Sequence, residues 1–277
     1  VLLRSADPAF GAISGLRWTG DGFVAVTDTG NWLAFRSEER DGRLEGVADV
    51  RLAPILGPDG RPPSLKSAGD AEAVEIDPAG GLIVSYEQDH RLVHFPAMAS
   101  VPDRTERLTA TMGWAPNSGG EALAVLPGGA RLLFAERARR PDGSCEALLT
   151  SDGETRTIGL PCPGGDFSPT DAVALDASHV LVLHRRFTPP FGVGAALTLI
   201  DLAPMLAGAD SGAPARELAR WRSPVVIDNM EGLALRRDGG RTFLYLVSDD
   251  NMNPLQNTVL IKLELLPATS TRIAGHR

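Results

Sequence analysis

A motif that recurs five times constrains this chain of 277 residues more than any other feature. Its clearest copy is NMEGLAL at residues 229–235, and weaker copies lie at residues 13–18, 71–76, 120–125 and 170–175. Aligned on the second position of residues 13–18, the copies place one residue each in a single column: Ser14, Glu72, Glu121, Asp171 and Glu231. The gaps are 58, 49, 50 and 60 residues, and closing the circle from Glu231 to Ser14 needs another 60. Five similar units therefore use up the chain.

The repeat predicts an all-β, five-bladed β-propeller of four-stranded antiparallel blades. Gly or Ala follows the column residue in every copy, which indicates crowding where innermost strands converge on a central channel. Turn-forming residues separate four strand patterns in each of the first four repeats and three in the fifth. The alternative is a six-bladed ring with a degenerate blade hidden in residues 48–66 or 203–222. We expect one domain over residues 1–277, in which the N-terminal strand of residues 1–5 closes the last blade.

Composition narrows the classes of partner. The net charge is −8, and no run of Lys and Arg is long enough to follow a nucleic-acid backbone, so nucleic acid is excluded. No apolar run approaches the roughly 20 residues that a membrane helix needs. We therefore expect a soluble, monomeric protein that binds a small anionic or ester substrate.

Two cysteines flank a predicted hairpin with its turn at Asp152-Gly153. If Ser151 faces Glu154, Cys145 faces Leu160, which lies two residues short of Cys162. A diagonal disulfide and two unpaired thiols both remain open. A disulfide would indicate an oxidising compartment. The chain begins with Val1 and carries no signal peptide, which is consistent with a trimmed mature form or an expressed fragment.

The acidic members of the repeat column predict a metal site. Glu72, Glu121, Asp171 and Glu231 should project from converging strands at one mouth of the channel. Because no Lys or Arg occurs in this column, either their pKa values rise or a cation lies among them. Calcium accepts a ring of mixed carboxylates more readily than magnesium or zinc does. We therefore expect a divalent cation, most simply calcium, with Asp249, Asp250 or Asn251 as supplementary ligands.

A second polar column follows the second strand of each blade and should face the same mouth. Its members are Asp28, Glu87, Glu136, His184 with Arg185, and Asp249 with Asp250 and Asn251. Candidate catalytic residues are Glu136, His184 and Asp249. Candidate substrate-binding residues are Lys66, Arg137, Arg185, Arg186 and Asn251. The alternative for any one of these residues is an ordinary solvated side chain at a strand end.

Two segments resemble a known family. TDAVAL with HVLVLHRRF, and NMEGLAL with LVSDDNMNPLQNTVLIKLEL, resemble the phytase-like bacterial family described by esterase-like activity of phytase. Weaker likeness at FGAISGL and GEALAVLP extends it over almost the whole chain. The resemblance implies a β-propeller, export to the periplasm or the medium, and a metal-dependent hydrolase of phosphate esters or carboxylesters. It transfers no catalytic residue to this sequence.

Two functions remain open at this stage. The first is a calcium-dependent hydrolase of phosphate esters such as phytate-like substrates, or of carboxylesters, with its site at the channel mouth. The second is a non-catalytic propeller that binds a ligand or a partner on the same face, because this fold carries many functions.

Overall fold

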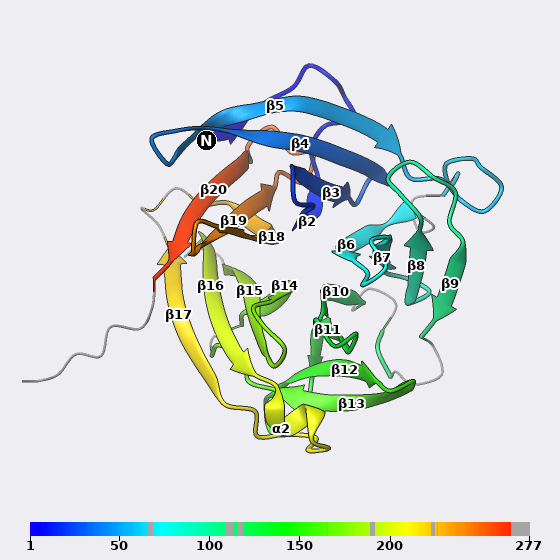
Figure 1. Ribbon diagram of the computed structural model, residues 1–277, viewed down its shortest axis with the longest axis vertical. Helices are drawn as coiled ribbons and strands as arrows, with labels where there is room; N and C mark the ends of the chain where they lie inside the picture. Colours follow the sequence, from blue (N-terminus) through cyan, green and yellow to red (C-terminus); the bar gives the residue numbers. More distant parts are fainter. Residues whose placement is uncertain are drawn as a thin grey trace, which may run out of the picture.

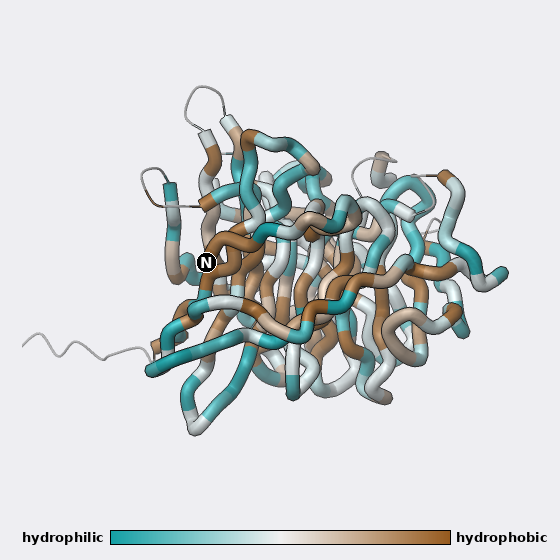
Figure 2. The backbone as a smooth tube through the Cα atoms, turned by 90° about the horizontal axis from the view of Figure 1, so that it is seen from above, coloured by the Kyte–Doolittle hydropathy of each residue, from teal (hydrophilic) through white to brown (hydrophobic). Residues whose placement is uncertain are grey.

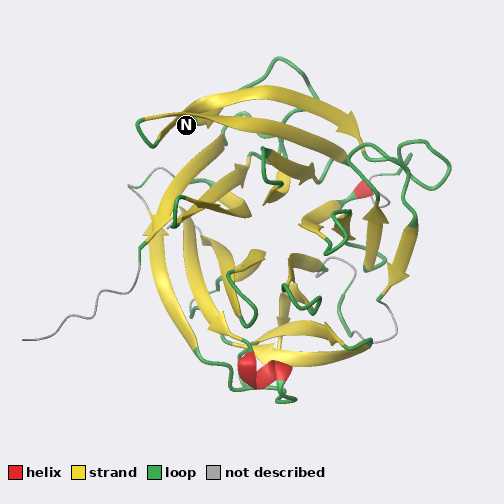
Figure 3. Ribbon diagram, viewed as in Figure 1, coloured by secondary structure: helices red, strands yellow, loops and turns green. Residues whose placement is uncertain are grey.

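A computed structural model describes residues 1–65, 69–108, 113–115, 119–164, 166–188, 192–222, 225 and 227–266. Five separate four-stranded antiparallel sheets stand around a central axis like blades, and strands dominate the ring (Figures 1 and 3). The predicted five-bladed β-propeller is confirmed, and the six-bladed alternative is wrong. The only helix with assigned bounds in this part of the chain is α2 (Ala203–Leu206), a single turn.

Each blade runs from an innermost strand at the axis to an outermost strand at the rim. Blade 1 contains β2 (Ile13–Trp18), β3 (Phe23–Thr27), β4 (Asn31–Arg40) and β5 (Arg43–Pro54). Blade 2 contains β6 (Ala71–Ile76), β7 (Leu82–Tyr86), β8 (Arg91–Phe95) and β9 (Arg104–Arg107). Blade 3 contains β10 (Gly120–Val125), β11 (Arg131–Arg139), β12 (Cys145–Ser151) and β13 (Glu154–Leu160). Blade 4 contains β14 (Ser168–Ala174), β15 (His179–Thr188), β16 (Gly192–Asp201) and β17 (Ala215–Arg222).

Blade 5 combines the two ends of the described chain. It contains β18 (Asn229–Asp238), β19 (Arg241–Asp249), β20 (Thr258–Leu265) and, at the rim, β1 (Leu2–Leu3). β1 pairs antiparallel with the start of β20, Leu2 opposite Val259 and Leu3 opposite Thr258. The first segment of the chain thus completes the last sheet and closes the ring.

Apolar side chains fill the spaces between neighbouring blades. In Figure 2, apolar stretches run through the middle of the disc, whereas hydrophilic stretches gather in the loops and hairpins at its faces. Between blades 5 and 1, Phe23 packs on Tyr245 and Phe35 with ring centroids 4.6 and 5.1 Å apart. Close to the axis there is no room for side chains: a Cβ at Gly15 would lie 2.9 Å from the backbone nitrogen of Val74. This crowding explains the small residue in the repeat.

Each innermost strand contains one β-bulge. The position of this bulge aligns the five repeats more accurately than the sequence does. The residue that the pairing register skips is Ser14, Glu72, Glu121, Thr170 or Glu231 in blades 1 to 5. The sequence alignment chose Asp171 for blade 4, which is wrong by one residue. Asp171 is the first residue after the bulge and pairs with Leu183 on β15. In blades 3 and 5 the same position holds the small residues Ala122 and Gly232, which pair with β11 and β19. Because a one-residue shift reverses the side of the strand, Asp171 points elsewhere than the three glutamates.

The two hydroxyl residues of the bulge position join neighbouring blades. Ser14 Oγ donates a hydrogen bond of 2.5 Å to the carbonyl oxygen of Ala71, directly before the bulge of blade 2. Thr170 Oγ1 donates one of 2.9 Å to the carbonyl oxygen of Met230, directly before the bulge of blade 5. The matching partners support the equivalence of Thr170 with Ser14. The bulge therefore links blades where it carries a hydroxyl and presents a carboxylate in the other three.

Arg17, on β2, connects the innermost strands of all five blades. Its guanidinium donates to the carbonyl oxygens of Leu123, Ala172 and Leu233 at 2.5, 2.6 and 2.9 Å. It also pairs with Glu75, 3.0 Å from Nε, and with both carboxylate oxygens of Asp171. Arg17 is 2% exposed, so this buried network fills the centre of the propeller below the glutamates of the bulge.

The hairpin of β12 and β13 has the predicted register, Ser151 opposite Glu154 and Cys145 opposite Leu160. Cys145 and Cys162 form a disulfide with a Cα–Cα distance of 5.6 Å. Of the two possibilities that the sequence left open, the diagonal disulfide is the one observed. No helix within the described residues is long and apolar enough to cross a membrane.

Candidate functional site

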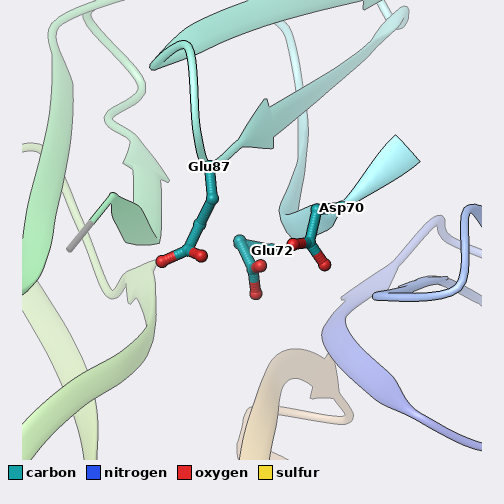
Figure 4. Close-up of side chains that lie close together, drawn as sticks. All are labelled: Asp70, Glu72 and Glu87. Carbon is teal, nitrogen blue, oxygen red and sulfur yellow. The ribbon is translucent and has the colours of Figure 1, made fainter. Parts of the chain in front are cut away.

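Two layers of polar residues meet at the face of the disc where the innermost strands begin and the second strands end. The first layer is the bulge position, with Glu72, Glu121 and Glu231 as its acidic members. The second layer comes from the second strands, either near their ends or directly after them: Asp28, Glu87, Glu136, Arg185 and Asp249. In Figure 4 the carboxylates of Asp70, Glu72 and Glu87 extend from blade 2 toward the centre of the ring. We call this face the mouth.

The blade 2 and blade 3 side of the mouth carries the densest set of carboxylates. Asp70, Glu72 and Glu87 form one group, and Glu87, Glu121 and Glu136 form a second; within each group, one oxygen per residue lies within 4.8 Å of the others. Glu87 belongs to both groups. In the described part of the chain, no lysine or arginine forms an ion pair with Glu72 or Glu121. The groups therefore form a continuous anionic surface across two blades.

The electrostatics of this surface disfavour full ionisation. Burial raises the pKa of Glu72 well above its usual value, and the nearby carboxylates of Glu87 and Asp70 raise it further. The pKa of Glu121 is also raised well above its usual value, by burial and then by Glu72 and Glu136. A cation or a shared proton would relieve this repulsion.

Arg185 contributes a positive charge on the opposite side of the mouth. Arg185 Nε lies 2.5 Å from Oε1 of Glu231, and its Nη2 lies 3.2 Å from Oε1 of Glu136. Arg137, largely exposed, lies 2.8 Å from the other oxygen of Glu136. Burial still raises the pKa of Glu231 to about 8, although Arg185 opposes the shift. Glu231 therefore has a cationic partner from the second polar layer, although the repeat column itself contains no Lys or Arg.

Two of the sequence-predicted site residues do not lie at the mouth. Asp171 accepts hydrogen bonds from both Nη atoms of Arg17, at 2.8 and 2.9 Å, and from the backbone of Leu233 at 2.7 Å. Its carboxylate is used in the centre of the ring, so we withdraw it as a metal ligand. His184 is fully buried inside blade 4 with Nε2 2.8 Å from Thr198 Oγ1, and burial lowers its pKa to about 3. It has no access to substrate.

The remaining candidates differ in their surroundings, and one of them lies outside the described residues. Arg186 stacks on the ring of Phe167, 5.0 Å from its centroid, within blade 4. Asn251 is exposed, and its backbone N–H donates to Asp249 at 2.6 Å. Asp250 accepts from the backbone of Ala12 at 3.0 Å and thereby ties blade 5 to blade 1. Lys66 lies outside the described residues.

The sequence analysis missed Asp70 and did not propose Glu87 as a ligand. Asp70 precedes the bulge of blade 2 by two residues, as Asn229 precedes that of blade 5, so the repeat contained the signal. The backbone directly after Glu87 is strained, because Gln88 and His90 have φ of 62° and 41°, in the left-handed region. The backbone N–H of Gly119 donates to Glu87 Oε1 at 3.3 Å. A Cβ at Gly119 would approach Glu87 Cγ to 3.0 Å, so only glycine fits without a shift.

Comparisons with solved structures return matches at low identity. A luciferin-regenerating enzyme is 10% identical, with 93% of this chain and 77% of that chain covered and a TM-score of 0.50. A gluconolactonase from Xanthomonas campestris is 14% identical, with coverage of 93% and 77% and a TM-score of 0.47. A streptogramin B lyase is 8% identical, with coverage of 96% and 87% and a TM-score of 0.44. At such identities these similarities concern the fold alone.

A comparison with curated protein sequences finds no match. The family comparison is informative, because the model of the phytase-like family, described as "Esterase-like activity of phytase", matches residues 8–252. The match includes all five bulges and both polar layers of the mouth. The resemblance noted in the sequence is therefore confirmed, and the chain belongs to the phytase-like family.

Proposed function

We propose that the protein is a hydrolase of anionic esters, with phosphate esters as its first substrate class, that uses a divalent cation at the mouth. The observation that carries the proposal is the division of the mouth into two halves. Carboxylates gather on blades 2 and 3, whereas Arg185 projects from blade 4. An ester with a negative charge can contact both a cation on the acidic half and the guanidinium opposite.

The donor set fits calcium. Two oxygens bound to one Ca²⁺ at about 2.4 Å lie at most about 4.8 Å apart, which each carboxylate group satisfies. The ligands would come from Asp70, Glu72, Glu87 and Glu121, and Glu136 lies beside them. Bound there, calcium would polarise a phosphoryl or carbonyl oxygen and lower the pKa of a coordinated water.

The chain's own residues have separate roles in this proposal. Arg185 binds the anionic oxygens of the ester, and its ion pairs with Glu136 and Glu231 fix its orientation. Glu136 is the candidate general base, since its carboxylate belongs to an acidic group and also contacts Arg185. Asp249 is the second candidate, because burial raises its pKa to about 6, close to the range in which a general base works.

The family match and the disulfide each support one part of this proposal. Membership of a family described by esterase-like activity supports a hydrolase, and carboxylesters are therefore the second substrate class. The Cys145–Cys162 disulfide supports work in an oxidising compartment, which is the periplasm or the extracellular medium for a bacterial protein.

The test is a panel of substrates measured with calcium and with chelator. We expect p-nitrophenyl phosphate or inositol hexakisphosphate to be hydrolysed faster than p-nitrophenyl acetate, and only with calcium. Glu121→Gln should lower kcat at least about a hundredfold, whereas Glu154→Gln, at the exposed first residue of β13, should leave it unchanged. Calcium-independent turnover contradicts the metal assignment. No turnover of any ester, with retained binding of an anionic ligand, identifies a non-catalytic binding propeller instead.

A matched pair of variants tests the role of Arg185 in substrate binding. Arg185→Gln should raise KM for anionic esters at least about tenfold, because a partly buried charge-assisted contact is lost. Arg137→Gln removes an exposed arginine that also contacts Glu136 and should change KM less than about twofold. Equal effects of the two substitutions contradict a special role for Arg185.

A further inference from the structure

A polar pocket lies between blades 2 and 3, at the face opposite the mouth. It has a volume of about 300 Å³, and its wall includes Asp77, Gly129 and Asp152, in the turns that follow β6, β10 and β12. Since β6 and β10 begin at the mouth, the turns after them lie at the other end of the blades. At roughly 30 Å³ for each water molecule, the pocket has room for a small ion and several waters.

A buried histidine and an arginine from blade 2 form one wall of this pocket. His94, on β8, is 5% exposed and lies opposite Arg104, on β9, in the strand register. Nη2 of Arg104 lies 3.0 Å from Nδ1 and 2.8 Å from Nε2 of the His94 ring. Burial lowers the pKa of His94, and the positive charges of Arg104 and Arg131 lower it further. At neutral pH the ring is therefore uncharged, and one of its two nitrogens carries a hydrogen.

The protonated nitrogen of His94 has no acceptor from the protein in the part of the chain that the structure describes. Arginine can only donate hydrogen bonds, so Arg104 serves the other ring nitrogen. Oε2 of Glu106 lies 4.0 Å from Nε2 of His94, beyond hydrogen-bond distance. Because a buried N–H group without an acceptor is costly, this donor indicates a ligand that supplies an oxygen atom.

Arg104 also carries a charge that no nearby carboxylate neutralises. Among the described residues it forms no ion pair, whereas Arg131 binds both oxygens of Glu106, at 2.7 and 2.8 Å. Asp77 accepts hydrogen bonds from two backbone N–H groups of its own turn, at 2.6 and 3.2 Å. Asp152 is exposed at the tip of its turn, where water and salt screen its charge. The pocket therefore combines a guanidinium without a carboxylate partner and a buried N–H donor.

We propose that this pocket binds a phosphate or sulfate group. The oxygens of such a group would accept a hydrogen bond from the protonated nitrogen of His94 and charge-assisted bonds from the planar guanidinium of Arg104. The hydroxyl group of Ser151, which also lines the pocket, can donate another. The site lies at the face opposite the proposed cation site and shares no residue with it. Binding here therefore requires neither calcium nor ester hydrolysis.

Titration calorimetry of the calcium-free protein with inorganic phosphate, in chelator, tests the site. Arg104→Gln should raise the Kd at least about tenfold, because the charged donor is lost. Arg107→Gln is the matched control on the same strand. Its ion pair with Asp89 lies outside the pocket, so the Kd should change less than about twofold. Arg185→Gln should likewise keep the affinity, because Arg185 lies at the mouth.

Nitrogen-15 NMR locates the bound phosphate. Phosphate should shift the ring N–H signal of His94, which is identified by its loss in His94→Phe. Glycerol 3-phosphate then distinguishes the source of the group: a Kd below that of phosphate indicates a phosphorylated molecule, and a higher Kd indicates the free ion. The proposal is overturned by no binding to the unmodified protein, by equal Kd values for Arg104→Gln and Arg107→Gln, or by an unchanged His94 signal.

Discussion

Arg17 and Asp171 form a two-bond ion pair at the centre of the propeller, 2.8 Å from Nη1 to Oδ2 and 2.9 Å from Nη2 to Oδ1. The pair joins the innermost strands of blades 1 and 4. The same guanidinium contacts the innermost strands of blades 2, 3 and 5. Each blade is thereby fixed to one shared side chain, which sets the geometry of the mouth above it.

Removing this arginine should destabilise the whole ring. Arg17→Met leaves the buried carboxylate of Asp171 without its cation, and we expect a loss of about 3–5 kcal/mol in the free energy of unfolding. Urea titration followed by fluorescence measures it. Arg36→Met, which removes an exposed ion pair with Asp21, should cost less than about 1 kcal/mol. Equal costs for the two substitutions contradict the central role of Arg17.

The stability of the metal-free protein should fall as pH rises. Burial raises the pKa of Glu231 from 4.5 in its ordinary state to about 8, so between these values the native state binds more protons than the unfolded chain. Stability from this group is complete below pH 4.5 and is lost as pH rises through 8. In chelator, the melting temperature at pH 8.5 should lie at least about 5 °C below that at pH 5.

Glu231→Gln provides the control for this pH dependence. The amide cannot ionise, so the difference between the two melting temperatures should shrink in this variant. A wild-type protein that is more stable at pH 8.5 than at pH 5 would contradict the burial of these carboxylates.

Gly119→Ala should disturb the mouth without unfolding the blade. The new Cβ would lie 3.0 Å from Cγ of Glu87 and 3.3 Å from Nδ1 of His90, so both side chains must move. We expect calcium affinity to fall at least about tenfold, because ligand positions are set by such supporting contacts. Gly128→Ala has no neighbour within 4 Å of the added Cβ and should bind calcium like the wild type. Titration calorimetry on both variants measures the difference, and equal affinities would contradict a supporting role of Gly119 at the calcium site.

The five-bladed propeller can be predicted from the sequence because every blade contains a recognisable copy of the repeat. Small residues beside a polar one mark each innermost strand, and the hairpin register around Asp152 follows from turn chemistry. The alignment fails in blade 4, where Asp171 resembles the acidic column although Thr170 occupies the bulge. The spacing between the two polar layers identifies the bulge residue of blade 4 more reliably. The second-layer residue follows the bulge by 15 residues in blades 2 and 3, and Arg185 follows Thr170 by 15.

Contacts across the ring were harder to predict. Arg17 is the only charged residue in the innermost strand β2, so it signals a buried partner, but the partner Asp171 lies 154 residues away. Likewise, the distance between Arg185 and Glu231 depends on how blades 4 and 5 are placed around the axis. Local patterns identify the blades, whereas the pairing of charges depends on closure of the whole ring.

The most direct test of the cation site is calcium titration of the metal-free protein by calorimetry, together with its melting temperature. We predict binding of calcium and a rise in melting temperature that Glu72→Gln and Glu121→Gln each abolish. Asp171→Asn should lower stability yet keep the response to calcium, because its carboxylate serves Arg17. No heat of binding in the wild type, or a calcium response lost in Asp171→Asn and retained in Glu121→Gln, would contradict the account.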